Sequence, residues 1–237
     1  MKIQFKAVNK EALDTPPEPV KFHLPDWYKK MPTNMAGKEF NASTFNKFNA
    51  QTVYTIKKCV PFLDYLTSGY LIRSPKQILI DPTEDNGIKN YQFRHSGDTA
   101  LISTHPHDQC PIKIDGAKHH YIKFMNSWIV TTPPGYSSLF IQPLSIGNSK
   151  FVLFPGIVDT DKFDDPVNFP GYVTSKENFM VDCGEPLMVV IPFKRDNWKM
   201  EVSETVFDRT ATKVQNKFAQ YMANIYRDFF HSKKRYD

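Results

Sequence analysis

Two histidines stand two positions apart in the segment Thr104-His105-Pro106-His107-Asp108-Gln109. On a β-strand, side chains at positions i and i+2 point to the same side, which is the arrangement that a pair of metal ligands needs. Neutral imidazole binds Zn, Cu, Fe and Ni. His105 and His107 are therefore candidate ligands of a divalent metal, and His105 and Gln109 are candidate ligand-binding residues.

The surroundings of this pair weaken the metal hypothesis. A cupin-like enzyme of the oxygenase or hydroxylase type needs a glutamate shortly after such a pair and a further histidine one or two strands later. Gln109 stands near the place of that glutamate, and after His120 the next histidine is His231. Binding of a divalent metal is thus an alternative hypothesis and not the favoured one, and the sequence identifies no cofactor. The other reading is that His105 and Gln109 hydrogen-bond within a loop.

Two carboxylates form the second constellation, in the run Gly156-Ile-Val-Asp-Thr-Asp161. Asp159 and Asp161 are candidate catalytic residues, because a carboxylate can take a proton from water as a general base. The simpler interpretation is that both cap a turn. Arg195 could bind a carboxylate or phosphate, as a guanidinium does with its planar fork of donors, or merely pair with a nearby acidic residue.

The bulk composition excludes several classes of protein. The chain has 237 residues, 41% of them hydrophobic, which is enough for one large or two small domains. Its net charge of +5 is not a strong nucleic-acid signal. No apolar run is long enough to span a bilayer, and the N-terminus lacks the apolar core of a signal peptide. The three cysteines form no CxxC pair, which favours a cytosolic location.

Proline and aromatic residues indicate the architecture. The chain has 18 Pro against 10 Gly, and 14% of its residues are aromatic. Short apolar runs separated by Pro, Gly and Asn are typical of β proteins, and Asn86-Gly87 is a strong hairpin signal. The sequence therefore predicts a mainly β fold, with one barrel or sandwich of short strands. A β-clip and a double-stranded β-helix or jelly roll both remain open.

Two flanking segments differ from this β pattern. Residues 1–50 are predicted to be an extended N-terminal arm, residues 51–204 the β domain, and residues 205–237 a C-terminal amphipathic helix with a basic tail. In the last segment apolar residues recur at steps of three and four, which is typical of one helix face: Phe207, Ala211, Val214, Phe218, Tyr221, Ile225 and Phe229. This stripe packs on the core or serves as a face for a partner.

The order of these elements resembles the dUTPase and dCTP deaminase superfamily, whose fold is the β-clip. The turn Pro133-Pro-Gly-Tyr136 corresponds to the family's turn before a strand, and Gly156-Ile-Val-Asp-Thr-Asp161 to its catalytic motif. The resemblance implies that Asp159 activates water and that Tyr136 lies at the ligand. The family's phosphate-binding Arg-Ser turn is replaced here by Phe140-Ile-Gln-Pro143. Nucleotide binding or hydrolysis is therefore an alternative function.

A more specific resemblance covers roughly residues 20–200 and points to a family of tailed-phage and bacterial proteins that form a domain of unknown function. It rests on several short runs: Pro25–Lys29, Pro61–Asp64, Thr67–Tyr70, His105 with Gln109, Trp128 with Thr132–Ser137, Gly156–Asp161, Val167–Pro170 and Ile191–Arg195. The leading hypothesis is a phage-type protein with a structural or binding role that self-associates or binds phage proteins, with no membrane contact. The resemblance implies a location in the cytoplasm of a host cell, with the virion as the alternative. Whether the protein is also an enzyme stays open.

Overall fold

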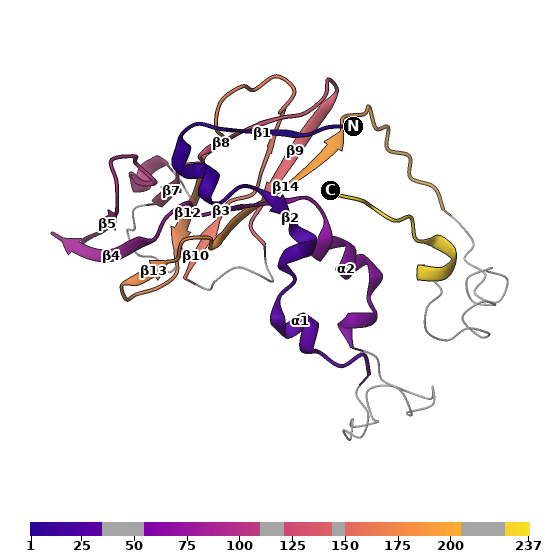
Figure 1. The fold of residues 1–237 in the computed structure, drawn as a ribbon, viewed down its shortest axis with the longest axis horizontal. Helices are drawn as coiled ribbons and strands as arrows, with labels where there is room; N and C mark the ends of the chain where they lie inside the picture. Colours follow the sequence, from indigo (N-terminus) through magenta and orange to yellow (C-terminus); the bar gives the residue numbers. More distant parts are fainter. Residues whose placement is uncertain (35–54, 110–120, 144–149, 205–225) are drawn as a thin grey trace. The chain divides into compact units, whose positions relative to one another are not determined.

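The computed structural model describes residues 1–34, 55–109, 121–143, 150–204 and 226–237 (Figure 1). The chain divides into two compact units. One comprises Met1–His23 and Gly69–Arg195, and the other comprises Leu24–Ser68 and Asp196–Asp237. The predicted domain boundaries after residues 50 and 204 stay a prediction, because residues 50 and 205 both lie outside the described part.

The first unit contains all the described strands, and the prediction of a mainly β protein is confirmed. The strands are β1 (Gln4–Ala7), β2 (Glu18–Pro19), β3 (Tyr70–Arg73), β4 (Ile78–Asp85), β5 (Ile88–His95), β6 (Ile102–His105), β7 (Tyr121–Phe124), β8 (Trp128–Thr131), β9 (Tyr136–Ile141), β10 (Phe151–Leu153), β11 (Gly156–Val158), β12 (Phe169–Val173), β13 (Phe179–Val181) and β14 (Pro186–Lys194).

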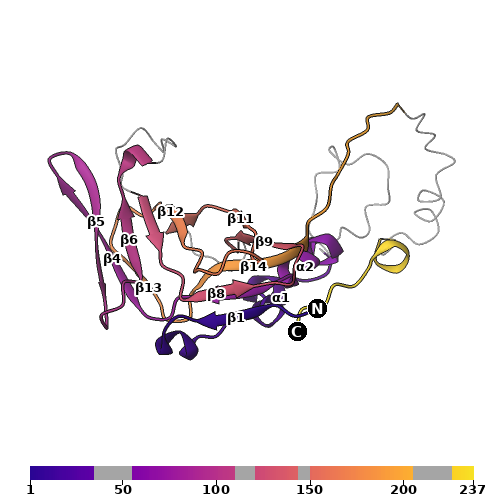
Figure 2. The same cartoon turned by 90° about the horizontal axis from the view of Figure 1, so that it is seen from above.

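These strands pair antiparallel in four sheets (Figures 1 and 2). A five-stranded sheet has the order β11-β9-β14-β3-β2, and a four-stranded sheet has the order β10-β12-β7-β6. The remaining sheets are β13-β4-β5 and the pair β1-β8. The described strands do not close into a single barrel, so the predicted barrel is not seen in this part of the chain.

The five-stranded sheet carries apolar residues on both faces. Phe140 and Val190 are paired across β9 and β14, and both belong to the main hydrophobic core. On the opposite face, Val189 forms a second, smaller cluster with Leu71 and Val20. This alternation follows from the two-residue period of a strand, which sends successive side chains to opposite faces.

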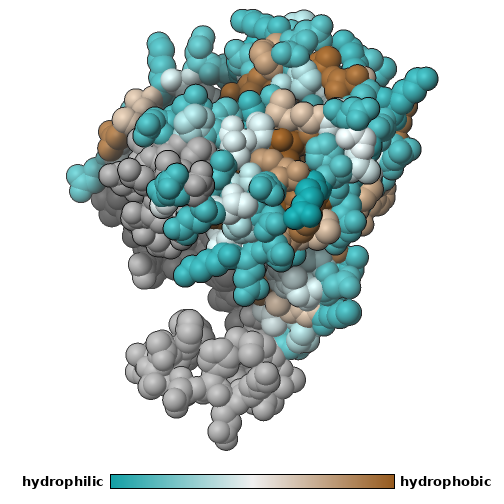
Figure 3. Space-filling model, turned by 90° about the vertical axis from the view of Figure 1, so that its left-hand side faces the viewer, coloured by the Kyte–Doolittle hydropathy of each residue, from teal (hydrophilic) through white to brown (hydrophobic). Residues whose placement is uncertain are grey.

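The predicted hairpin at Asn86-Gly87 is confirmed. β4 and β5 pair along their full length, and Asp85 is opposite Ile88, so the loop has two residues. Both loop residues have positive φ, 50° for Asn86 and 74° for Gly87, as a type I′ turn requires. Figure 3 views the molecule from this side, where the coloured part of the surface has hydrophilic side chains with hydrophobic ones between them.

Strands β10 and β12 approach each other closely at Gly171, which pairs with Leu153. A Cβ atom on Gly171 would lie 2.2 Å from the carbonyl oxygen of Val152 and 2.9 Å from the Cα of Leu153. Both are backbone atoms and cannot rotate away. Glycine is therefore required at this position by the packing of the sheet.

The second unit contains the two α-helices, α1 (Asp26–Lys30) and α2 (Val60–Thr67). Asp64 of α2 binds the end of the chain, through His231 Nε2 at 3.1 Å and through Lys234 Nζ. Most of the predicted C-terminal helix, residues 205–225, lies outside the described part, and Tyr226–Phe230 forms one π-helical turn. The helices of the described residues include none that is both long and apolar enough to cross a membrane.

Candidate functional site

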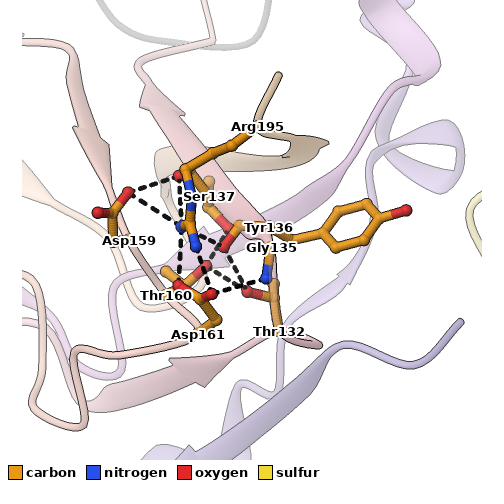
Figure 4. Close-up of polar contacts among 9 residues, drawn as sticks. Thr132, Gly135, Tyr136, Ser137, Asp159, Thr160, Asp161 and Arg195 are labelled. Atoms are coloured by element: carbon orange, nitrogen blue, oxygen red, sulfur yellow. Dashed lines mark hydrogen bonds and ion pairs between the residues drawn. The ribbon is translucent and has the colours of Figure 1, made fainter. Parts of the chain in front are cut away.

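Three neighbouring strands of the five-stranded sheet bring distant residues together at one end. β9 lies between β11 and β14 and is antiparallel to both. The start of β9 therefore lies beside the ends of β11 and β14. As a result the turn before Tyr136, the turn Asp159–Asp161 and Arg195 meet at the same end of the sheet (Figure 4). These residues are called the Arg195 cluster below, together with Gly135 and Ser137.

Arg195 is the centre of this cluster. Its Nη1 donates to Asp161 Oδ1 at 2.7 Å, and its Nη2 donates to Asp161 Oδ2 at 2.5 Å. Nη1 also lies 3.1 Å from Asp159 Oδ1 and donates to the Tyr136 carbonyl and Ser137 Oγ, each at 3.1 Å. The guanidinium thus faces two carboxylates of its own chain, and these hold its pKa above the usual value, with Asp161 as the largest cause.

Asp161 is the buried member of the carboxylate pair, with only 5% of its side chain exposed. Besides Arg195 it accepts a hydrogen bond from the backbone N–H of Gly135 at 2.8 Å. Gly135 has a φ of +83°, a conformation that residues with a side chain rarely adopt. In this conformation its N–H points toward the carboxylate of Asp161. The hydrogen bonds from Arg195 and Gly135 lower the pKa of Asp161 to about 2.

Asp159 is the accessible member, with 52% of its side chain exposed. Ser137 Oγ donates to Asp159 Oδ1 at 2.6 Å. This hydrogen bond is the largest cause of a lowered pKa at Asp159, and the charge of Arg195 acts in the same direction. A general base works best when its pKa is near the working pH, so the environment of Asp159 favours a permanent anion over a proton acceptor.

Three buried hydroxyl groups form a hydrogen-bonded layer beside the turns that carry the two carboxylates. Thr160 Oγ1 lies 2.8 Å from Thr132 Oγ1 and 2.9 Å from Ser138 Oγ, and all three residues are buried. Thr132 also donates to the Tyr136 carbonyl at 3.2 Å. Because buried hydroxyls are costly unless they are paired, this layer fixes the turns that carry Asp159 and Asp161.

The structure brings together four of the residues that the sequence singled out: Asp159, Asp161, Arg195 and the backbone of Tyr136. The ring of Tyr136 points away from Arg195 (Figure 4). Ser137, Thr132 and Thr160 were missed, although the first two stand in the quoted run Thr132-Pro-Pro-Gly-Tyr-Ser137 and the third between the aspartates. The catalytic roles of Asp159 and Asp161 stay predictions.

The histidine segment is part of another sheet. His105 ends β6, and its Nδ1 lies 2.7 Å from Gln109 Oε1. None of the contacts described connects this pair with the Arg195 cluster. The side chain of His107 lies outside the described residues, so the proposed metal pair stays a prediction. Among the residues that the structure describes, no three His, Cys, Asp or Glu side chains are grouped so as to hold a metal ion.

No protein-family model and no curated protein matches this sequence. The chain is similar to several solved dUTPase structures. A mutant dUTPase from phage phi11 of S. aureus gives a TM-score of 0.37 at 11% identity, over 88% of this chain and 99% of the other. The dUTPase of Staphylococcus bacteriophage 80alpha gives 0.38 at 10% identity, over 87% and 99%.

The dUTPase of EIAV gives a TM-score of 0.34 at 11% identity, over 59% of this chain and 87% of the other. These TM-scores and identities are low. The likeness therefore does not define the function of this chain, which has to rest on its own residues.

Proposed function

We propose that this protein has a structural or binding role in a phage-type system and acts by associating with other protein chains, including copies of itself. The observation that carries the proposal is the closed state of the Arg195 cluster. Both terminal nitrogens of the guanidinium bind carboxylates of the same chain, so the strongest candidate for binding an anion is already occupied.

Charge balance supports the same conclusion. The guanidinium of Arg195 and the nearby ammonium of Lys162, which also lowers the pKa of Asp159, balance the two carboxylates, so the cluster has no surplus positive charge to attract an anion. A triphosphate would have to displace Asp161 from Arg195 and would then be repelled by both aspartates. A cluster of paired charges is suited to holding the start of β9 and the ends of β11 and β14 together.

Exposed apolar residues support association with protein. Ile157 on β11 is 67% exposed. It is paired with Leu139 on β9, which is in turn paired with Ile191 on β14. These three residues form an apolar row across three strands, called the Ile157 row below. Apolar groups on an exposed sheet face are typical of surfaces that bind another chain.

Nucleotide binding is the rival function, because the exposed carboxylate of Asp159 stands where the β-clip resemblance places a catalytic residue. A thermal-shift and hydrolysis screen with the common ribo- and deoxyribonucleoside triphosphates separates the two functions. We expect no stabilisation at millimolar nucleotide and no phosphate release. Stabilisation or turnover that disappears in Asp159→Asn would overturn the proposal in favour of the nucleotide function.

The binding role itself is tested by association. Sedimentation velocity over a concentration series should show reversible self-association of the purified chain. Immunoblots of purified virions and of the infected-cell cytoplasm then distinguish a virion component from a factor of the host cytoplasm. A strict monomer that is absent from virions would count against the proposal.

The cupin-like alternative is tested by measuring the metal content of the same purified protein. No contact among the described residues favours it, since His105 binds Gln109. Stoichiometric metal in elemental analysis, lost in His105→Ala, would revive it.

A further inference from the structure

The four-stranded sheet β10-β12-β7-β6 has one face in the main hydrophobic core and a second face turned away from it. Ile122 and Phe124 of β7 belong to the core. Because successive residues of a strand point to opposite faces, Tyr121 and Lys123 of the same strand lie on the second face. In the register of β6 and β7, His105 is opposite Tyr121 and shares its face. The second face therefore carries polar and aromatic side chains that the core does not use.

Three aromatic rings are in contact on this second face. Tyr172 of β12 lies on it because Pro170, two residues earlier, pairs with Lys123. Phe154, directly after β10, contacts both tyrosines, with its ring centroid 6.3 Å from that of Tyr121 and 5.8 Å from that of Tyr172. The rings are tilted by 43° and 45°, so neighbours do not cover each other's faces. Phe154 and Tyr172 are half-buried, and their rings can accept another planar group.

Lys123 adds a positive charge beside these rings and is itself half-buried. Within the described part of the chain, its ammonium group makes no hydrogen bond and no ion pair. A partly buried charge without a counter-ion is unfavourable, and a bound anion would supply the counter-ion. The residues of this surface are called the Phe154 platform below: His105, Tyr121, Lys123, Phe154 and Tyr172.

His105 and Gln109 place hydrogen-bonding groups at the β6 edge of the platform. His105 Nδ1 lies 2.7 Å from Gln109 Oε1. Because an amide oxygen can only accept, Nδ1 carries the proton, and Nε2 of the neutral ring is left as an acceptor. Gln109 is exposed, and its amide nitrogen is a donor. The edges of nucleobases are recognised by donors and acceptors of this kind, and their faces by aromatic rings.

We propose that the Phe154 platform binds single-stranded nucleic acid. Bases stack on the rings of Phe154 and Tyr172, and the ammonium group of Lys123 pairs with a backbone phosphate. His105 and Gln109 meet the edge of a neighbouring base. This function goes beyond association with other protein chains, because it gives the molecule a second kind of ligand on a different sheet.

The spacing of the rings favours a single strand over a duplex. The centroids of Phe154 and Tyr172 are 5.8 Å apart, which is well above the roughly 3.4 Å between stacked bases of B-DNA. Successive bases can rest on successive rings only if the strand is extended, which a duplex does not allow. The unpaired cation of Lys123 favours nucleic acid over an uncharged ligand such as a carbohydrate. Aromatic side chains combined with positive charge are the usual means of holding a single strand.

Fluorescence anisotropy with a labelled oligonucleotide tests the binding. The probe is an oligothymidylate of about 20 nucleotides, which exceeds the site size of many single-strand binders. The full chain is titrated into this probe at low salt, and an oligouridylate and a DNA duplex of the same length are measured in parallel. We expect saturable binding of one or both single strands and clearly weaker binding of the duplex.

Substitutions of the rings test the stacking. Phe154→Leu and Tyr172→Leu keep an apolar side chain but remove the ring, and each should raise the dissociation constant at least about fivefold. Tyr172→Phe is the matched control, because it keeps the ring and should bind as the wild type does. Circular dichroism and thermal melting check that all three variants fold.

Lys123→Gln tests the charge. The logarithm of the association constant of a single strand falls with the logarithm of the salt concentration, and each phosphate contact contributes about 0.7 to the slope. We therefore expect Lys123→Gln to reduce the slope by about 0.7. Lys194→Gln is the control, because Lys194 is exposed at the end of β14 in another sheet and its replacement should leave the slope unchanged.

The outcomes separate the possibilities. Absence of binding at low salt, equal binding of duplex and single strand, or ring variants that bind as the wild type does would each overturn the proposal. Ring-dependent binding to a glycan array without oligonucleotide binding would also overturn it and would assign a carbohydrate ligand instead. The platform shares no residue with the Arg195 cluster or the Ile157 row, so failure of this proposal leaves the associating role standing.

Discussion

Arg195 and Asp161 are joined by two parallel hydrogen bonds, Nη1 to Oδ1 at 2.7 Å and Nη2 to Oδ2 at 2.5 Å. The pair connects the end of β14 to the turn after β11, across the strand β9 that lies between them. Two parallel bonds fix the orientation of both groups as well as their distance. The ion pair therefore fixes the position of the end of β14 relative to the turn after β11.

The first prediction concerns the fork geometry of Arg195. Arg195→Lys keeps the positive charge but cannot form both bonds to Asp161. We expect the melting temperature to fall by about 5 °C, because the buried carboxylate is left with an incomplete partner. Differential scanning calorimetry measures the change. Arg94→Lys is the matched control, since Arg94 makes an exposed pair with Asp81 and its replacement should have little effect. Equal effects of the two replacements would contradict a special role for Arg195.

The second prediction concerns acid stability. The pKa of Asp161 is lowered from its ordinary value of 3.8 to about 2. Its contribution to stability is therefore complete above about pH 4 and is lost as the pH falls through the folded-state value near 2. The stability difference between wild type and Asp161→Asn should be constant near neutral pH and shrink below pH 4. Urea unfolding at several pH values gives this difference. A difference that grows on acidification has the wrong sign for this mechanism.

The third prediction tests the close approach of β10 and β12. Gly171→Ala places a Cβ atom against the backbone at Val152 and Leu153. We expect the free energy of unfolding to fall by about 3 kcal/mol, because backbone atoms must move to make room. Gly156→Ala is the control, since a Cβ there meets nothing within 4 Å and φ is not positive. Denaturant unfolding measures the free energy of unfolding of both variants. Similar losses of this free energy in the two variants would refute the packing argument.

The fourth prediction concerns the end of the chain. Burial alone would raise the pKa of Asp64, but the hydrogen bonds from Lys234 and His231 outweigh it and leave the pKa below its usual value. These contacts are therefore present above the ordinary pKa of an aspartate and weaken as the pH falls through the lowered value. Asp64→Asn should release the tail, so that trypsin cuts after Lys233 and Lys234 several times faster than in wild type.

The control for this experiment is Asp228→Asn. Asp228 pairs with Arg227 beside it in the sequence, so its loss leaves the contact with α2 intact. If the cleavage rate after Lys233 rises equally in both variants, Asp64 does not hold the tail.

The sequence predicted the strands well where turn residues bound them. Asn86-Gly87 located the β4–β5 hairpin. The rule that Pro and Gly separate the strands does not hold at β12, because Pro170 and Gly171 both lie inside this strand. β1 lies in the segment that was predicted to be an extended N-terminal arm. Its residues alternate as a strand does, but their partner β8 begins more than a hundred positions later, and local pattern carries no information on such pairing.

The sequence predicted the charged members of the candidate site and Tyr136, but it did not predict the hydroxyl-bearing residues. Asp159, Asp161 and Arg195 stood out by type and spacing. Ser137 and Thr160 did not, because their role depends on the register of β9 against β11 and β14, which only the folded sheet shows. The residue types alone also do not distinguish the two aspartates, whereas burial does: the side chain of Asp161 is enclosed and that of Asp159 is exposed.

The position of β14 in the sheet affects how the chain folds while it is being synthesised. It is the last of the described strands to leave the ribosome, yet it lies inside the five-stranded sheet, between β9 and β3. Until it emerges, β9 and β3 each have an edge without a partner, and such edges invite pairing with other nascent chains. We expect translation products that stop before residue 186 to aggregate or to be held by chaperones, and completion of β14 to be the step that commits the chain to its native sheet.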